Sequence, residues 1–163
     1  MTSDSPPKCD IHVHSTWSDG LLDIEELVYR AGLLNLEVLA ITDHFPAMGY
    51  HHALQDNPLQ DYFAEIQENK QGAMEKGTRL LSGLEFSVLG DIRDVPLQIL
   101  DLLLVEGLNG NPESFFSQFF PIARQIKKAR GLDFPLVIAP TLSLVPQPPP
   151  ILKVISRDWK RFA

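Results

Sequence analysis

Short apolar runs alternate along the chain with longer segments whose apolar residues recur every three to four positions. Five of the short runs are expected to be strands; they span residues 9–14, 38–42, 80–88, 100–105 and 136–139. The longer segments between them follow the helical period. Strands that alternate with helices usually form a parallel sheet, so the pattern predicts an α/β fold.

Three helices are expected in the longer segments between these strands. The first begins after Asp23, which can serve as its N-cap, with Glu26 three residues further on. The second is expected to begin at Asn57 and the third at Asn111, and Gly131 ends the third. The residues predicted to face the sheet are Ile24, Leu27, Val28, Ala31 and Leu34 in the first, Tyr62, Phe63, Ile66, Ala73 and Met74 in the second, and Phe116, Phe119, Phe120, Ala123 and Ile126 in the third.

The pattern changes after the fifth apolar run, where proline becomes frequent. Six of the 13 prolines lie between Pro135 and Pro150. Such a stretch favours extended polyproline geometry and cannot form a central strand. We therefore expect one domain, with an α/β core over residues 8–140 and a proline-rich C-terminal tail over residues 141–163.

Composition narrows the classes of partner. The formal net charge is -7, and an acidic balance disfavours nucleic acid as a partner. The single cysteine excludes an intramolecular disulfide. No apolar stretch approaches the roughly 20 residues that cross a bilayer, and residues 1–7 lack the pattern of a signal segment. We expect a cytoplasmic protein with no membrane partner.

The histidines carry the main functional signal, because all five lie within the first 52 residues. His12 and His14 are two apart on an expected strand, so both imidazoles face one side and can bind a transition metal together. Asp19 adds a carboxylate to the loop after this strand, where barrel enzymes hold their chemistry. The alternatives are a half-buried histidine pair and, for Asp19, an ordinary Asp-Gly turn with Gly20.

Two further candidates belong to the next strands. His44 follows the second strand and should point to the same edge of the sheet. Glu85 lies in the third strand among apolar neighbours, and an acid in such a place must be paired, protonated or bound to metal. The alternative for Glu85 is an ion pair with an arginine such as Arg79 or Arg93.

These residues lie in three ordered motifs that resemble those of the PHP (polymerase and histidinol phosphatase) family of metal-dependent phosphoesterases. Residues 10–20 read DIHVHSTWSDG, residues 41–44 read ITDH and residues 83–87 read GLEFS; they match D-x-H-x-H-S-x-x-S-D-G, I-T-D-H and G-x-E-x-S. The resemblance implies a distorted (β/α) barrel with divalent metals at its mouth. It places His12, His14 and Glu85 on the first metal, Glu85 also on the second, and Asp19 and His44 on the third.

The later part of the chain departs from the family's pattern. The family supplies further histidines shortly after the third motif, in an A-H-P motif and in a C-terminal D-x-H, but here no histidine follows His52 and residues 137–140 read VIAP. We therefore expect an incomplete barrel of PHP type with about five parallel strands. We also expect one or two divalent ions (Zn, Mn or Fe) per chain rather than three. His51 and His52 either replace a missing ligand or form an exposed loop pair.

Two functions are compatible with this resemblance. The first is a metal-dependent phosphoesterase that hydrolyses a small phosphate ester with metal-activated water, with His12, His14, Asp19, His44 and Glu85 as its catalytic, metal-binding residues. In that enzyme His44 could instead act as general acid if the metal beside it were absent. The second is a non-catalytic PHP-fold module for binding or regulation that has lost the late ligands.

An incomplete barrel also predicts assembly. A sheet edge without a neighbouring strand tends to pair with another chain, so we expect a homo-oligomer, most simply a two-fold dimer. The alternative is that residues 140–163 fold back over the edge.

Overall fold

The computed structural model describes residues 6–46, 54, 59–107 and 112–139. Within them, five strands form one parallel sheet in the order β1-β2-β3-β4-β5, which is their order in the sequence. The expected α/β fold with five parallel strands is confirmed, and each strand begins and ends within two residues of its predicted bounds. The strands are β1 (Cys9–Val13), β2 (Val38–Ile41), β3 (Arg79–Ser87), β4 (Leu102–Glu106) and β5 (Leu136–Ile138).

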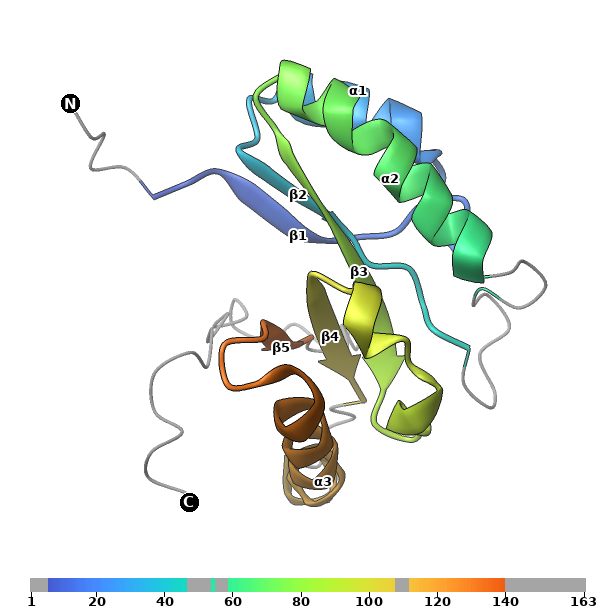
Figure 1. The fold of residues 1–163 in the computed structure, drawn as a ribbon, viewed down its shortest axis with the longest axis vertical. Helices are drawn as coiled ribbons and strands as arrows, with labels where there is room; N and C mark the ends of the chain where they lie inside the picture. Colours follow the sequence, from blue (N-terminus) through green and yellow to red (C-terminus); the bar gives the residue numbers. More distant parts are fainter. Residues whose placement is uncertain (1–5, 47–53, 55–58, 108–111, 140–163) are drawn as a thin grey trace, which may run out of the picture.

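The long strand β3 curls the sheet, because its two halves pair with different neighbours. Residues 79–82 pair with β2, whereas residues 83–87 pair with β4. The pairing changes at Gly83, where a Cβ would lie 2.7 Å from the Thr42 methyl carbon. The result is a half-barrel in which β4 and β5 turn away from β1 and β2 (Figure 1).

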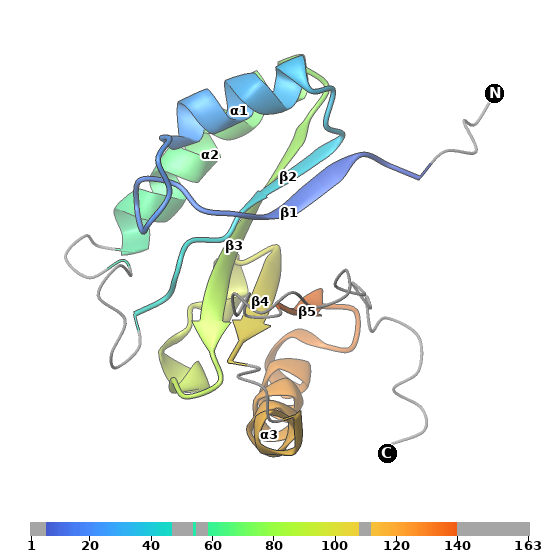
Figure 2. The ribbon, with the colours of Figure 1, turned by 180° about the vertical axis from the view of Figure 1, so that it is seen from behind.

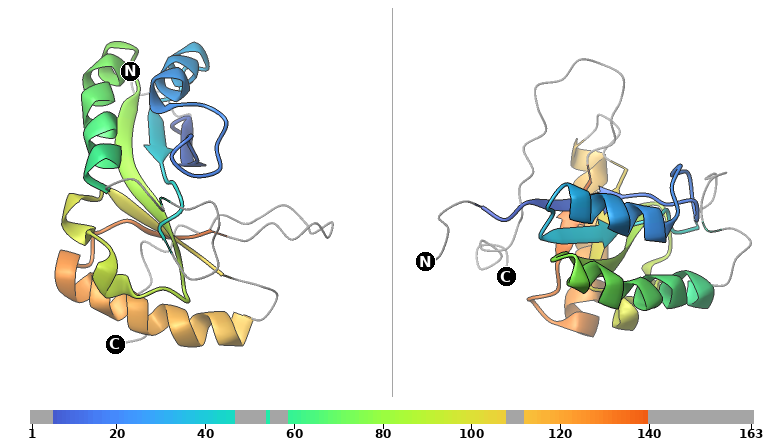
Figure 3. Two further views of the ribbon diagram at one scale, coloured as in Figure 1. Left: turned by 90° about the vertical axis from the view of Figure 1, so that its right-hand side faces the viewer. Right: turned by 90° about the horizontal axis from the view of Figure 1, so that it is seen from above.

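Helices cover both parts of this sheet. The helices α1 (Ile24–Leu33) and α2 (Leu59–Glu75) pack against each other over β2 and β3 (Figure 3), and α3 (Pro112–Arg130) lies at the other end, below β4 and β5 (Figures 1 and 2). Two short 3-10 turns that the pattern did not predict, η1 (Ile92–Asp94) and η2 (Leu97–Ile99), precede β4, and α3 packs against η2. None of the helices in the described residues is long and apolar enough to cross a membrane.

The helix ends that lie in the described residues agree with the sequence. Asp23 is the N-cap of α1, and its side chain accepts a hydrogen bond of 2.8 Å from the Glu26 backbone N–H. Gly131 follows α3 with a φ of 86°, in the left-handed region that glycine adopts without strain. The predicted helix starts at Asn57 and Asn111 and the tail over residues 141–163 lie outside the described residues.

Two predicted core residues at helix ends are exposed instead. Leu34 is 64% exposed and Met74 is 74% exposed. Leu34 is the C-cap of α1 rather than part of its last full turn, and Met74 lies in the last turn of α2. The prediction was wrong for both because it extended the apolar period past the point where each helix still covers the sheet.

The buried face of α3 also differs from the prediction. Phe116 and Phe120 are 36% and 40% exposed, although both were expected to face inward. Two pairs of adjacent phenylalanines allow two helical phases, and the sequence does not decide which phase meets the sheet. The buried stripe runs through Phe115, Phe119, Ile122, Ala123 and Ile126.

Tyr62 connects α2 to β2 and β3, close to the strand ends at which His44 and Glu85 lie. Its side chain is fully buried, and its hydroxyl donates to the carbonyl oxygen of Gly83 at 3.0 Å and lies 3.3 Å from that of Ile41. It thereby ties β2 to β3 at the position where the sheet changes partner.

We predict that Tyr62→Phe lowers the free energy of unfolding by about 1 kcal/mol, because the ring still fills its place while a buried carbonyl loses its donor. Urea denaturation followed by circular dichroism measures this difference. The control is Tyr29→Phe, since Tyr29 is 51% exposed on α1 and its hydroxyl should contribute little. Equal stability of the two variants would contradict the role assigned to the Tyr62 hydroxyl.

Candidate metal centre

Polar side chains gather where four strands end on the same edge of the sheet. His12 lies in β1 and His14 directly after it, Glu85 lies near the end of β3, and Glu106 is the last residue of β4. His44 follows β2 and forms an isolated parallel bridge with Glu85, in which the Glu85 N–H donates to Asp43 and the Phe45 N–H donates to Glu85. Because parallel strands end on one side, the fold brings these side chains together.

The loop after β1 is held in place by a buried acid. Asp43 is fully buried and accepts hydrogen bonds from the Ser15 N–H at 2.8 Å, the Ser15 hydroxyl at 2.7 Å and the Ser18 hydroxyl. These bonds fold residues 15–18 back toward β2. Gly20 closes the loop by donating to the Ser15 carbonyl, and a Cβ at this position would lie only 2.1 Å from the His14 carbonyl oxygen. The closed loop carries Asp19 back to His14.

One carboxylate oxygen lies at the centre of the cluster. Glu85 Oε2 is 2.9 Å from His14 Nε2, 3.1 Å from His12 Nε2 and 3.3 Å from His44 Nδ1. Among the described residues, neither Glu85 Oε2 nor His14 Nε2 makes a hydrogen bond, although both atoms are buried. These short distances therefore lack the alignment of hydrogen bonds.

The same distances suit the ligands of a metal ion. Two ligand atoms that each lie 2.0–2.1 Å from a tetrahedral ion are roughly 3.3 Å apart. Imidazole nitrogens and carboxylate oxygens are the donors that Zn, Mn and Fe use in proteins. A buried carboxylate oxygen beside three imidazole nitrogens thus fits the donor set of a divalent cation.

Three groups of donors could each hold an ion. Within each group the ligand atoms lie within 4.8 Å of one another. All five residues expected from the sequence occur in these groups, and their role as metal ligands stays a prediction. The groups are His12, His14 and Glu85; His14, Asp19 and His44; and His44, Glu85 and Glu106.

Glu106 was not among the residues expected from the sequence. This side chain is buried at the end of β4, and its Oε1 lies 3.8 Å from His44 Nδ1. Glu106 is an acid that ends an apolar strand, just as Glu85 is an acid within one. An acid in an apolar strand is therefore a signal that marks Glu106 as well as Glu85, although it does not show that the two side chains meet.

The structure decides between the alternatives for Glu85 and Asp19 in part. Arg93 forms an ion pair with Asp91 on the surface, so it does not neutralise Glu85. Asp19 does more than form a turn, because its carboxylate oxygen lies 2.6 Å from His14 Nδ1 in a hydrogen bond. His51 and His52 lie outside the described residues.

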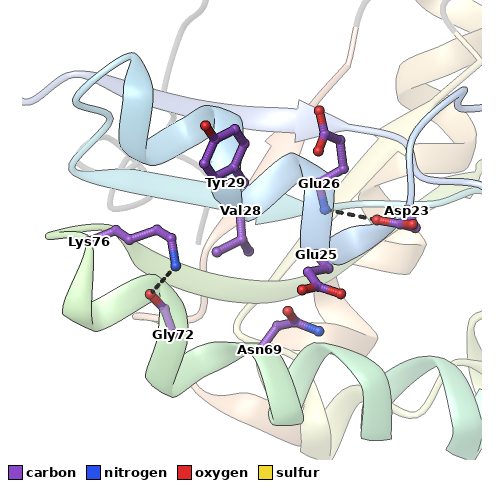
Figure 4. A pocket seen from close by; sticks show the side chains of 8 residues that line it. All are labelled: Asp23, Glu25, Glu26, Val28, Tyr29, Asn69, Gly72 and Lys76. Atoms are coloured by element: carbon purple, nitrogen blue, oxygen red, sulfur yellow. Dashed lines mark hydrogen bonds between the residues drawn. The ribbon is translucent and has the colours of Figure 1, made fainter.

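A hollow elsewhere on the surface does not belong to this centre. It has a volume of about 500 Å³ and lies between α1 and α2 (Figure 4). None of its lining residues is a member of the three donor groups. The residues that line it are Asp23, Glu25, Glu26, Val28, Tyr29, Asn69, Gly72 and Lys76.

The proximity of acids and imidazoles shifts their protonation in the metal-free protein. Burial by itself lowers the pKa of His14, but the carboxylates of Glu85 and Asp19 outweigh it and raise the pKa to about 9. Burial by itself raises the pKa of Glu85, but the neighbouring imidazoles, led by His12 and His14, lower it to about 2. The centre therefore holds opposite charges at neutral pH.

Comparisons with known proteins agree with the motifs. The model of the family described as PHP domain matches residues 10–136. The chain is 39% identical over 80 residues to a 5'-3' exoribonuclease of Haemophilus influenzae, and 33% identical over 84 residues to the DNA polymerase/3'-5' exonuclease PolX of Bacillus subtilis. These matches cover 49% and 52% of this chain but 23% and 14% of the two relatives, so the chain spans less than a quarter of their lengths.

A solved structure has a similar fold. It is that of a protein assigned as the histidinol phosphatase hisK of Listeria monocytogenes, with a TM-score of 0.53 and 16% sequence identity. The match covers 74% of this chain and 60% of that chain. At this identity the likeness concerns the fold, and it agrees with an incomplete barrel.

We predict that His14 titrates near pH 9 in chelator-treated protein and that Asp19→Asn lowers its pKa toward the ordinary 6.5, because one of two raising carboxylates is removed. A pKa raised by folding means that this attraction stabilises the fold fully below pH 6.5 and is lost as the pH rises through about 9. NMR titration of the histidine ring protons measures both values. A His14 pKa near 6.5 in the unmodified chain would contradict the geometry.

Proposed function

The chain belongs to the PHP domain family of phosphoesterases, and on that premise we propose that it is a metal-dependent phosphoesterase that hydrolyses a small phosphate ester with metal-activated water. The observation that carries the proposal is the convergence of His12, His14 and His44 on one buried oxygen of Glu85. A catalytic or metal-binding role explains such a cluster better than a role in stabilising the fold. A buried acid among three imidazoles stabilises a fold less than apolar packing of the same volume.

The residues of the centre differ in how far they are exposed to solvent. When bound, a divalent ion such as Zn, Mn or Fe lowers the pKa of a water molecule and stabilises negative charge on phosphoryl oxygens. The side chains of Glu85, His44 and His14 are 5%, 12% and 18% exposed, whereas those of His12 and Asp19 are 40% and 44% exposed. We infer that substrate approaches from the side of His12 and Asp19.

The acidic chain favours a small substrate. The two curated relatives are named as an exoribonuclease and as a polymerase with exonuclease activity, which makes the end of a nucleic acid a second candidate. The net charge of -7 weakens that candidate, because binding to a phosphate backbone rests on lysine and arginine contacts. A small phosphate monoester is therefore our first choice.

The non-catalytic module remains the opposing hypothesis. It rested on the missing late histidines, and Glu106 at the centre weakens that argument, since a carboxylate now stands beside His44 and Glu85. A cytoplasmic location and a homo-oligomer stay predictions from the sequence.

We predict that the unmodified chain binds divalent metal and that the double change His12→Ala with His14→Ala abolishes binding at the first group, because only Glu85 is left there. Elemental analysis after gel filtration in metal-free buffer measures the ion content. The matched control is Glu26→Ala with Arg30→Ala, which removes an exposed pair on α1 and should leave the metal content unchanged. Equal metal content in the double histidine variant and the unmodified chain would show that the site is assigned wrongly.

We also predict that the chain hydrolyses p-nitrophenyl phosphate when Mn²⁺ is added, and that Glu85→Gln lowers kcat/KM by at least about 100-fold, since loss of a ligand should exceed the loss seen for groups that only orient ligands. Release of p-nitrophenol measures the rate, and bis(p-nitrophenyl) phosphate tests a diester beside the monoester. Faster hydrolysis of the diester would favour a nucleic-acid end as substrate. If metal binds but neither compound is hydrolysed, the non-catalytic module is the better description.

A further inference from the structure

Two of the histidines face carboxylates with both ring nitrogens. His14 Nδ1 lies 2.6 Å from Asp19 and His14 Nε2 lies 2.9 Å from Glu85. His44 Nε2 lies 3.6 Å from Asp19, and His44 Nδ1 lies 3.3 Å from Glu85 and 3.8 Å from Glu106. Each ring could thus serve two of the three donor groups.

The chemistry of imidazole prevents both from being used at once. A neutral ring has one nitrogen with a free lone pair, and the other nitrogen carries a proton. Each histidine therefore coordinates one ion. The group of His14, Asp19 and His44 shares a ring with each of the other two groups, so it cannot be filled while both of those are filled.

The geometry of His14 indicates which nitrogen carries the proton. Its Nδ1 makes an aligned hydrogen bond with Asp19, whereas its Nε2, which is buried, makes none with any described residue. When a bound ion displaces the second proton of the ring, the proton that stays on Nδ1 leaves the lone pair on Nε2, which lies 2.9 Å from Glu85. His14 is therefore prepared to coordinate on the side of His12 and Glu85, with Asp19 as the acceptor that orients the ring.

Burial of two acids favours an ion in the third group. Glu85 and Glu106 are 4% and 5% exposed, and both offer an oxygen to the same group of ligand atoms within 4.8 Å. Two carboxylates this close and this buried repel each other, and a cation bound between them relieves that repulsion. Asp19, with 44% of its side chain exposed, carries no such cost, because water solvates it.

We propose that the centre holds two ions rather than three. One is bound by His12, His14 and Glu85, and the other by His44, Glu85 and Glu106. Asp19 is then a positioning residue that fixes the proton on His14 Nδ1, and not a ligand as the resemblance implied. With two carboxylates and one imidazole, the second position discriminates less strongly against Mn²⁺ and Fe²⁺ in favour of Zn²⁺ than the first position does. This inference rests on the proposed metal-binding function and names Glu106 as the residue that completes it.

Counting Mn²⁺ in carboxamide variants tests the proposal. The full chain is loaded with Mn²⁺, separated from free ion, and measured by elemental analysis and by electron paramagnetic resonance. We expect two ions with exchange coupling in the unmodified chain and one uncoupled ion in Glu106→Gln. In Asp19→Asn we expect two ions, of which the one bound by His14 is held about 10–100-fold more weakly. The matched control is Glu113→Gln, an exposed residue on α3, which should retain two ions.

The position of the proton on His14 gives a second measurement, which a merely structural role of Asp19 would not affect. In Zn²⁺-loaded protein we expect nitrogen-15 NMR to show the proton of His14 on Nδ1, and Asp19→Asn to weaken its hydrogen-bond signature. The proposal is overturned if Glu106→Gln keeps two ions, if Asp19→Asn loses one, or if the unmodified chain binds three. A single ion in both the unmodified chain and Glu106→Gln defeats this inference alone, whereas no ion in the unmodified chain defeats the proposed function as well.

Discussion

Glu85 places a carboxylate inside the sheet at a depth where only 4% of the residue is exposed, and the arrangement around it follows from that burial. A charge removed from water destabilises the fold unless opposite charge or hydrogen bonds surround it. Here three imidazole nitrogens from two other strand ends lie within 3.3 Å of one of its oxygens. The strand order and the bridge between His44 and Glu85 bring those rings to this oxygen.

Features that depend on neighbouring residues were predicted well from the sequence. The five strands follow from apolar runs, the cap at Asp23 follows from its place before a helical period, and the shared face of His12 and His14 follows from the two-residue period of a strand. Features that depend on how distant segments of the chain pair were not predicted. Glu106 reaches the centre because Ser87 of β3 is in register with it, and no local pattern encodes that register.

The exposed phenylalanines on α3 illustrate the same limit on a smaller scale. Phe115 and Phe119 lie one position before Phe116 and Phe120, so both pairs fit the helical period equally well. The choice between them depends on where the helix meets η2 and the sheet, which is a tertiary contact. The helical period of the apolar residues predicted that the helix has an apolar face, and packing against η2 and the sheet determines which side of the helix is buried.

The change of partner along β3 has a mechanical consequence. Its first half belongs to a unit with β1, β2 and the two helices above them, and its second half belongs to a unit with β4 and β5. Either unit could open locally while the other remains paired, since they share one strand. His44 follows the first unit and Glu106 ends the second. An ion bound by both residues would therefore link the two units where they meet. Metal binding would then make the two units, which otherwise open separately, unfold together in one cooperative transition.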